Sequence, residues 1–195
     1  MKELLRSAPV DIITATGWSP DGRFLLYATY DTAAKNRDLW VLPSDGQKAV
    51  PFVQTPFEEE QGRFSPNGRW IAYVSNQSGA NEVYVRAFTS DFSRGSAGTG
   101  GSMLISRGGG TEPRWRGDSN ELFYLSSDGK MMAVEVMAGQ AFRAGTPAPL
   151  FQTPPGAIVG DVTSDGKRFL LVTSVGPSVS APFTVVLNWM AGLKN

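Results

Sequence analysis

WSPDGRFLLY, the stretch from Trp18 to Tyr27, carries the clearest structural signal in the sequence. Proline presets φ for the first central position of a turn, and the glycine after the aspartate accepts a positive φ. The apolar run Phe24–Tyr27 comes directly after the turn. Apolar residues on both sides of such a turn are typical of a β-hairpin, so the stretch predicts two antiparallel strands.

The same unit recurs three more times along the chain. Its later copies start at Phe64, Trp115 and Val162, and each again has a turn followed by an apolar run. A repeat of roughly 40–50 residues with strand-like content is typical of propeller blades and other β-arrays. The sequence therefore predicts an all-β fold, a β-propeller of four four-stranded blades, at residues 17–55, 62–108, 114–154 and 160–190.

The second strand of each repeat is apolar in its middle on both faces. These strands are expected at 24–28, 70–74, 121–125 and 168–172. Apolar residues are needed on both sides of a strand that lies between two neighbouring blades. The five tryptophans, at 18, 40, 70, 115 and 189, are interpreted as part of this core rather than as a sugar-binding platform. The Gly- and Ser-rich segment 90–101 is expected to be a loop.

The fourth repeat lacks an outermost strand, while the segment Lys2–Ser7 precedes the first repeat and has no blade of its own. Pairing this segment with the last predicted strand would complete the fourth blade and remove two sheet edges. We therefore expect residues 1–195 to form a single domain, a ring closed within one chain. The alternatives are an eight-bladed ring made by two chains and a piece of a larger propeller.

The composition limits the partners and the chemistry. Eighteen basic and eighteen acidic residues give a net charge of zero, which argues against a general nucleic-acid binder and against a basic membrane patch. The sequence has no histidine and no cysteine, so it provides neither a Ser-His-Asp triad nor a zinc site with those ligands. No apolar stretch of about 18 residues predicts a membrane span. Met1–Arg6 also lacks the apolar region of a signal peptide.

Residues 18–23 and 64–69 resemble the WD40-like (PD40) repeats of TolB-like β-propellers. Five further segments strengthen the resemblance: 54–64, 82–85, 109–115, 121–124 and 185–189. Together they resemble the C-terminal propeller that follows the kinase domain and membrane helix of acidobacterial-type serine/threonine protein kinases. The resemblance implies a sensor or interaction module that lies outside the cytoplasm, in the periplasm. The sequence itself contains no kinase motif.

An acidic run, Glu58–Glu60, leads into the first strand of the second repeat. Loops at this position lie near the axis of a propeller, so Glu59 and Glu60 are candidates for contacting a protein or peptide partner, and Glu112 joins them. A solvated acidic loop and a Ca²⁺ site are the alternatives. Adjacent residues of an extended chain point to opposite sides, however, and cannot all reach one ion. We therefore expect no metal and no cofactor.

The position just before the aromatic or apolar residue of the first strand holds Arg63, Arg114 and Asp161 in the last three repeats. If these side chains face the mouth of the channel, the two arginines could clamp a carboxylate or a phosphate group. The alternative is an ion pair between Asp161 and an arginine of a neighbouring blade. The predicted contact residues for a partner are therefore Glu59, Glu60, Arg63, Glu112, Arg114 and Asp161.

These observations predict a non-catalytic module that binds a protein or peptide at the face formed by the loops leading into the first strand of each blade. No residue is assigned a catalytic role, and we expect that the chain is not an enzyme. One alternative is the propeller accessory domain of a hydrolase of the prolyl oligopeptidase type. Another is a carbohydrate-binding or glycoside-active propeller, although no spacing singles out a pair of catalytic carboxylates.

Overall fold

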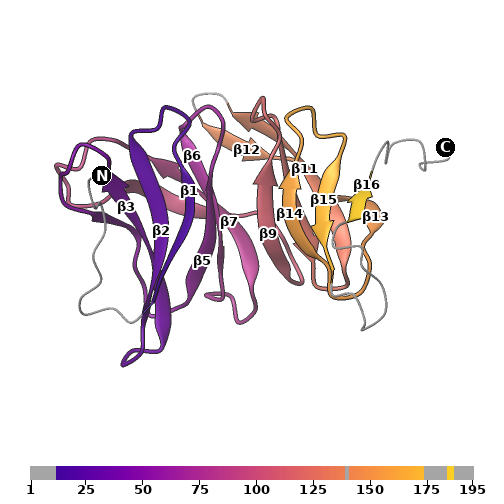
Figure 1. The fold of residues 1–195 in the computed structure, drawn as a ribbon, viewed down its shortest axis with the longest axis horizontal. Coiled ribbons are helices and arrows are strands. Elements are labelled where there is room, and N and C mark those ends of the chain that lie inside the picture. The colour runs from indigo at the N-terminus through magenta and orange to yellow at the C-terminus, as the bar shows by residue number, and fades with distance from the viewer. Residues whose placement is uncertain (1–11, 139–140, 174–183, 187–195) are drawn as a thin grey trace.

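The computed structural model describes residues 12–138, 141–173 and 184–186 (Figure 1). Every regular element in these ranges is a β-strand, and the strands form four antiparallel sheets. The described residues include no helix long and apolar enough to cross a membrane. The predicted all-β fold and its division into four blades are confirmed.

The first two sheets have four strands each, in sequence order. The first sheet consists of β1 (Ile12–Trp18), β2 (Phe24–Asp31), β3 (Asn36–Pro43) and β4 (Val50–Val53). The second sheet consists of β5 (Glu59–Phe64), β6 (Trp70–Ser75), β7 (Glu82–Phe88) and β8 (Gly98–Leu104). In both sheets the repeated turn joins the first two strands as a hairpin, which confirms the prediction from the opening stretch.

The third and fourth sheets depart slightly from this pattern. The third sheet contains β9 (Gly110–Trp115), β10 (Glu121–Ser126), β11 (Lys130–Ala138) and β13 (Ala148–Gln152). A short strand that the sequence did not predict, β12 (Phe142–Ala144), pairs with the far end of β11. Within the described residues the fourth sheet consists of β14 (Ile158–Val162), β15 (Phe169–Val172) and β16 (Thr184–Val186).

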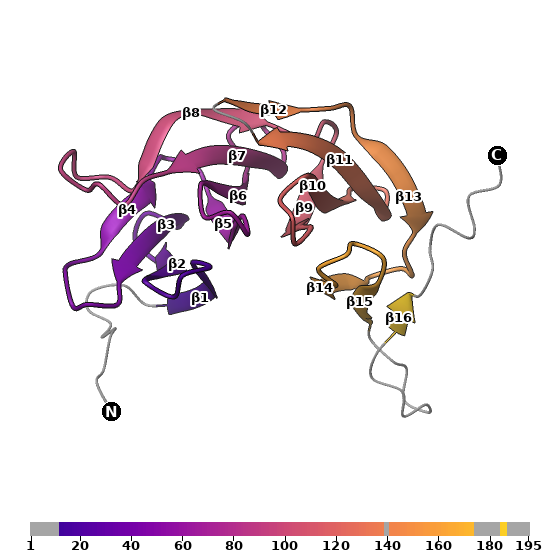
Figure 2. The same ribbon diagram turned by 90° about the horizontal axis from the view of Figure 1, so that it is seen from above.

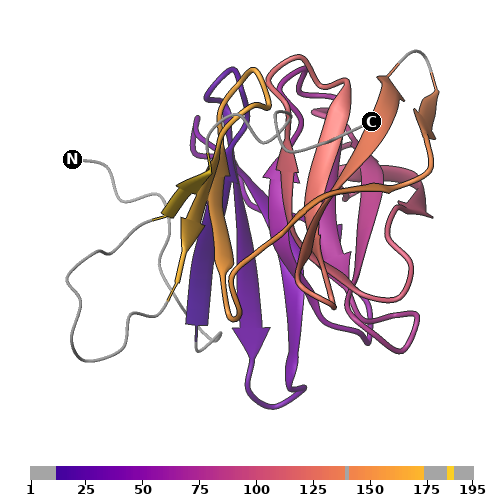
Figure 3. The same cartoon turned by 90° about the vertical axis from the view of Figure 1, so that its right-hand side faces the viewer.

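Figure 2 shows the four sheets standing side by side along an arc. The first strand of each sheet, namely β1, β5, β9 or β14, lies on the inner side of the arc, while β4, β8 and β13 lie on the outer side. Figure 3 shows that the strands of the different sheets run roughly along one common axis. The strand pair predicted to close the ring involves Lys2–Ser7, which lies outside the described residues.

The hydrophobic core consists of three clusters, one between each pair of neighbouring sheets. Strand β6 contributes Ile71 and Tyr73 to the first cluster and Ala72 and Val74 to the second. This division arises because alternate residues of a strand point to opposite faces. Complete burial of a large apolar side chain such as Ile71 contributes about 1.5–3 kcal/mol. The prediction that the second strand of a blade is apolar on both faces is confirmed for β6.

Two details of the sequence prediction are wrong. Trp18 is 49% exposed rather than buried between blades, because β1 lies at one end of the arc. The segment 90–101 is not a loop throughout, because β8 begins at Gly98. Only glycine fits there, since a Cβ at this position would lie 2.4 Å from the backbone oxygen of Phe52 in the first sheet.

Candidate functional site

Each inner strand takes part in a β-bulge, a point where its pairing with the next strand shifts register. Bulges change the direction of side chains and are frequent next to functional sites. In β5 and β9 the bulge holds a non-glycine residue with a positive φ, Gln61 at 55° and Glu112 at 56°. Such a conformation costs about 1–3 kcal/mol and persists only where surrounding contacts hold it. The second and third sheets are therefore strained at equivalent positions.

Hydrogen bonds between the two sheets hold these strained residues in place. The backbone N–H of Glu112 donates to Oε1 of Gln61, 2.7 Å away. The carboxylate of Glu112 accepts a hydrogen bond from Nη2 of Arg114 at 3.2 Å. Trp115 adds a further link, because its indole N–H donates to the backbone oxygen of Arg63 at 3.1 Å. The carboxylate of Glu112 is therefore fixed beside Arg114.

Arg63 and Arg114 connect neighbouring blades through main-chain oxygen atoms. Arg114 is buried and donates to the backbone oxygens of Val159 and Gly160 in β14. Arg63 donates to the backbone oxygen of Thr16 in β1. The structure therefore places both predicted arginines on the inner strands, but it commits much of each guanidinium to holding blades together. Fewer of their N–H groups remain to clamp an anion than the sequence suggests.

Carboxylates surround these two arginines. Burial, followed by the positive charge of Arg114, lowers the pKa of Arg63 to about 10, and the negative charges of Glu112 and Asp161 oppose this change. Arg63 therefore stays protonated near neutral pH. Asp161 is exposed and its charge acts on both guanidinium groups. We call Arg63, Glu112, Arg114 and Asp161 the inner-strand cluster.

Glu60 lies at the edge of the inner-strand cluster. Burial raises the pKa of Glu60, Arg37 lowers it, and the negative charges of Glu58 and Glu112 raise it further. The Glu60 carboxylate is 3.7 Å from Nε of Arg37, whereas the Glu58 carboxylate is only 3.0 Å from Nη1 of the same side chain. Arg37 is thus shared between two acids. Glu60 therefore adds a negative charge to the edge of the cluster, and Arg37 neutralises this charge only in part.

Glu59, in contrast, does not belong to this cluster. Its side chain is fully buried, and its Oε1 accepts hydrogen bonds from the hydroxyls of Thr55 at 2.6 Å and Ser75 at 3.3 Å. In a strand, adjacent residues point to opposite faces, so Glu59 is directed into the space between the first and second sheets. A partner cannot reach it there. This corrects the prediction that Glu59 is a contact residue.

The loop leading into β9 is fixed by Glu82 of β7. The Glu82 carboxylate accepts hydrogen bonds from the backbone N–H groups of Gly108 at 2.8 Å and Gly109 at 2.9 Å, and from the hydroxyl of Ser106. Both glycines have a positive φ, which other residues rarely adopt. Glu82 therefore sets the position from which β9 starts, and with it the third-sheet part of the cluster.

The structure gives no support to the alternative of a metal site. Within the described ranges, no three acidic, histidine or cysteine side chains are grouped so that they could hold a metal ion. The carboxylates of the inner-strand cluster instead face guanidinium groups and main-chain N–H groups.

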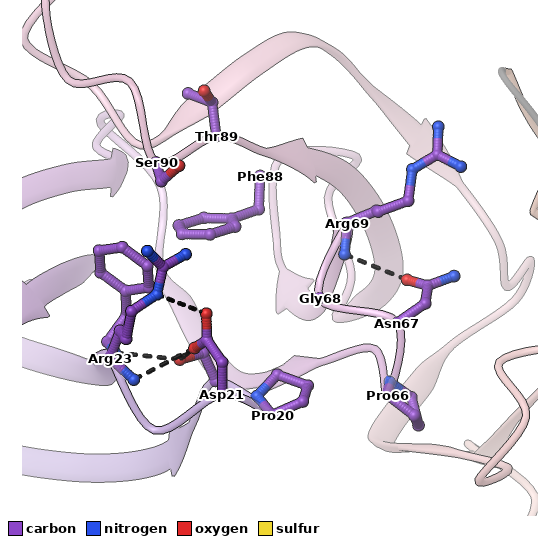
Figure 4. Close-up of a pocket in the computed structure, with 12 residues that line it drawn as sticks. Pro20, Asp21, Arg23, Pro66, Asn67, Gly68, Arg69, Phe88, Thr89 and Ser90 are labelled. Atoms are coloured by element: carbon purple, nitrogen blue, oxygen red, sulfur yellow. Dashed lines mark hydrogen bonds and ion pairs between the residues drawn. The ribbon is translucent and has the colours of Figure 1, made fainter.

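A second candidate lies between the repeated turns, which directly follow the inner strands. These are turn 1 (residues 19–23), turn 2 (65–69), turn 3 (116–120) and turn 4 (163–167). A pocket of about 420 Å³ separates turns 1 and 2, with Phe88 between them (Figure 4). Its rim carries Arg23 and Arg69, and Thr89 and Ser90 close one side. This pocket was not predicted from the sequence, in which the turns were interpreted only as connections between strands.

No protein-family model and no curated protein sequence matches the chain. Among solved structures, the chain is similar to TolB from Acinetobacter baumannii, with a TM-score of 0.59 and 20% identity, over 90% of this chain and 40% of that one. The chain has a TolB-like β-propeller fold. This agrees with the resemblance of its repeats, whereas the finer likeness to kinase-linked propellers is not shown by these comparisons.

Enzymes share this TolB-like fold. A periplasmic gluconolactonase from Pseudomonas aeruginosa matches with a TM-score of 0.55 and 18% identity, over 80% of this chain and 48% of that one. A puromycin hydrolase matches with a TM-score of 0.59 and 17% identity, over 98% of this chain and 29% of that one. The expectation that the chain is not an enzyme is therefore corrected, because the fold that suggested it also occurs in enzymes. The chain spans less than half of the length of each of these three structures.

Proposed function

We propose that this TolB-like propeller binds a segment of a protein or peptide partner along the inner strands β5, β9 and β14. Arg63, Arg114 and Asp161 lie at the turn ends of these strands rather than at the loops that lead into them. The contact surface is the inner-strand cluster together with Glu60. Three carboxylates and two guanidinium groups meet there, and the guanidinium groups are partly engaged by main-chain oxygens. A segment that presents a lysine or arginine side chain matches this arrangement best, because its cation would meet carboxylates that lack a full set of partners.

The observation that carries this proposal is the strained conformation of Glu112. A glycine would adopt its φ of 56° without penalty, yet the chain places a carboxylate at this point and secures it through Gln61 and Arg114. Strain that is held by several contacts is frequent at binding sites, where it prepares a side chain for its ligand. The equivalent strain at Gln61 supports the same interpretation.

The proposal can be tested with labelled heptapeptide libraries that have either lysine or glutamine at the central position. Fluorescence anisotropy should show tighter binding of the lysine library to the wild-type chain. The double variant Glu60→Gln/Glu112→Gln should lose this preference, while Glu135→Gln, which changes an exposed carboxylate on β11, should keep it. Equal binding of both libraries to the wild-type chain, or an unchanged preference in the double variant, would contradict the proposal.

A second candidate is a propeller segment of a larger hydrolase. The match to the puromycin hydrolase favours it, because 98% of this chain corresponds to only 29% of that protein. In this case residues outside the chain would provide part of the catalytic machinery. Peptide and ester substrates offered to the longest natural form of the protein would test the idea. Hydrolysis that disappears when the propeller is removed would support it, and a lack of hydrolysis would reject it.

We further propose that the binding module acts outside the cytoplasm. The name of the Pseudomonas aeruginosa neighbour, a periplasmic gluconolactonase, supports this location. Fractionation of cells that express the natural full-length protein would test it, with recovery in the cytoplasmic fraction as the contradicting result. The closed monomer expected from the sequence is also a proposal, and the mass of the chain in solution would distinguish it from a dimer.

A further inference from the structure

Neighbouring turns are hydrogen-bonded to each other at two of the three boundaries between sheets. The backbone N–H of Asn67 in turn 2 donates to the hydroxyl of Ser119 in turn 3, 3.0 Å away. The backbone N–H of Gly117 in turn 3 donates to the backbone oxygen of Ser164 in turn 4 at 2.9 Å. Turns 1 and 2, both fully described, share no such bond, and the pocket lies between them (Figure 4).

The open boundary has a cause in the sequence. The four turns have equivalent hydrogen bonds, and their residue with a positive φ is Gly22, Gly68, Ser119 or Gly166 in turn order. Only Ser119 has a hydroxyl, and this hydroxyl reaches the preceding turn. Gly68 has no side chain with which to reach turn 1. A Cβ at Gly68 would have Pro20 Cδ as its nearest neighbour, at the ordinary contact distance of 3.9 Å, so a small side chain would fit there without a clash.

The charge at this boundary is also unbalanced. In turn 1 the carboxylate of Asp21 accepts a hydrogen bond from Nε of Arg23 at 2.6 Å. Turn 2 has Asn67 in place of the aspartate. Asn67 keeps the bond to the backbone N–H of Arg69 at 3.1 Å but carries no charge. No carboxylate in the described part of the chain lies within ion-pair distance of Arg69. Its exposed guanidinium lies at the edge of the pocket, 6.0 Å from the centroid of the Trp70 ring, and has no anion beside it.

The wall of the pocket is aromatic. Phe24 and Phe88 meet edge to face, with ring centroids 5.3 Å apart, and both line the pocket. A neighbouring hollow of about 230 Å³ shares Arg23, Phe24 and Ser90 with it and continues past Phe92. The two hollows together form a groove, which we call the turn groove. Its first hollow offers an apolar wall beside a cation without an ion pair, while the second hollow is also lined by Asp45, whose carboxylate accepts hydrogen bonds from Gln47.

We propose that the turn groove is a second binding site, for an extended acidic peptide segment. A carboxylate of the segment pairs with the guanidinium of Arg69, and an adjacent apolar side chain packs on Phe24 and Phe88. Guanidinium and carboxylate form charge-assisted hydrogen bonds of matched geometry. The site rests on the proposed function as a peptide-binding module, but it uses other residues and selects the opposite charge. Either site can therefore fail without the other.

Two heptapeptide libraries, with a fixed central aspartate or asparagine and apolar neighbours, provide the test by fluorescence anisotropy. The wild-type chain should bind the aspartate library about fivefold more tightly, as expected for one partly exposed ion pair. Arg69→Gln should remove this preference. Lys167→Gln, at the equivalent position of turn 4 and away from the groove, should retain it. Gly68→Ser places a hydroxyl in the pocket, at the position equivalent to Ser119. Because this side chain takes up space between turns 1 and 2, it should weaken binding of both libraries.

The outcomes separate the two proposed sites. Equal affinity of the wild-type chain for both libraries, or a preference that survives Arg69→Gln, would overturn the turn groove. Circular dichroism of Arg69→Gln shows whether the exposed substitution leaves the fold intact, as a polar change at the surface should. The Glu60→Gln/Glu112→Gln variant should bind the aspartate library as the wild type does. A loss there would mean that acidic segments bind at the inner-strand cluster instead.

Discussion

Asp38 and Glu59 each bury one carboxylate oxygen without a hydrogen-bond partner, Oδ1 and Oε2 respectively, and the charge of Asp38 acts on Glu59. Burial is the largest influence and raises the pKa of both groups. Two buried acids without full hydrogen bonding favour the protonated form, because an ionised carboxylate is poorly stabilised away from water.

The contribution of Glu59 to the stability of the protein should therefore fall as pH rises above the ordinary glutamic acid pKa of 4.5. The folded state of Glu59 holds its proton to a higher pH than the unfolded state, so folding takes up protons in this window. Glu59→Gln removes that dependence. Urea unfolding between about pH 4 and pH 8 should show the variant gaining roughly 1 kcal/mol over the wild type as pH rises. A difference that does not change with pH would contradict this account, and Glu135→Gln serves as the exposed control.

The bond between turns 2 and 3 should contribute measurably to stability. Ser119→Ala removes the hydroxyl that accepts from the backbone N–H of Asn67, while the strained φ of 63° remains. We expect a loss of about 1 kcal/mol in the free energy of unfolding. Ser78→Ala, which changes an exposed serine in the loop between β6 and β7, should change stability by less than about 0.5 kcal/mol. Equal effects of the two substitutions would show that the turn contact is unimportant.

Arg114 should be a structural requirement of the inner-strand cluster. Arg114→Met keeps an apolar stem but leaves the backbone oxygens of Val159 and Gly160 and the carboxylate of Glu112 without their donor. We expect a loss of about 3 kcal/mol, measured by urea unfolding, because these acceptors are partly buried. The control is Arg168→Met at an exposed position. A loss below about 1 kcal/mol for Arg114→Met would mean that water replaces the guanidinium.

Two glycines of β8 provide a matched pair. Gly98→Ala would place a Cβ 2.4 Å from the backbone oxygen of Phe52, whereas Gly101→Ala meets nothing within 4 Å. The first substitution should lower stability by about 2 kcal/mol, because backbone of two sheets must move apart. The second should be neutral within about 0.5 kcal/mol. Thermal unfolding of both variants checks this, and similar melting temperatures would contradict the close packing of the first two sheets.

The sequence predicts the architecture well because the information is repeated. Four copies of one turn, each followed by an apolar run, define the hairpins, and the alternation in β6 shows that both faces are covered. The extra strand β12 was not predicted, because three residues provide too little pattern. Its Phe142 packs on Trp70 and Trp115, a contact between distant segments that periodicity cannot reveal.

The site is less visible in the sequence than the fold. Arg63, Arg114 and Asp161 were found because they occupy one position of the repeat, and the structure brings them together with Glu112. Gln61 was missed, since its role depends on a positive φ that is not encoded in a simple residue pattern. Glu59 was misplaced because residue type alone does not say which face of β5 it occupies. The turn groove depends on the difference between Gly68 and Ser119, which has meaning only once the turns are seen side by side.

The central claim is that a partner segment binds across the inner strands. Hydrogen–deuterium exchange, measured with and without a peptide selected from the lysine library, tests this claim most directly. The proposed function predicts slower exchange in β5 and β9, with little change in β8 and β13. Slower exchange confined to the outer strands, or no change in β5 and β9 when the site is saturated, would contradict it.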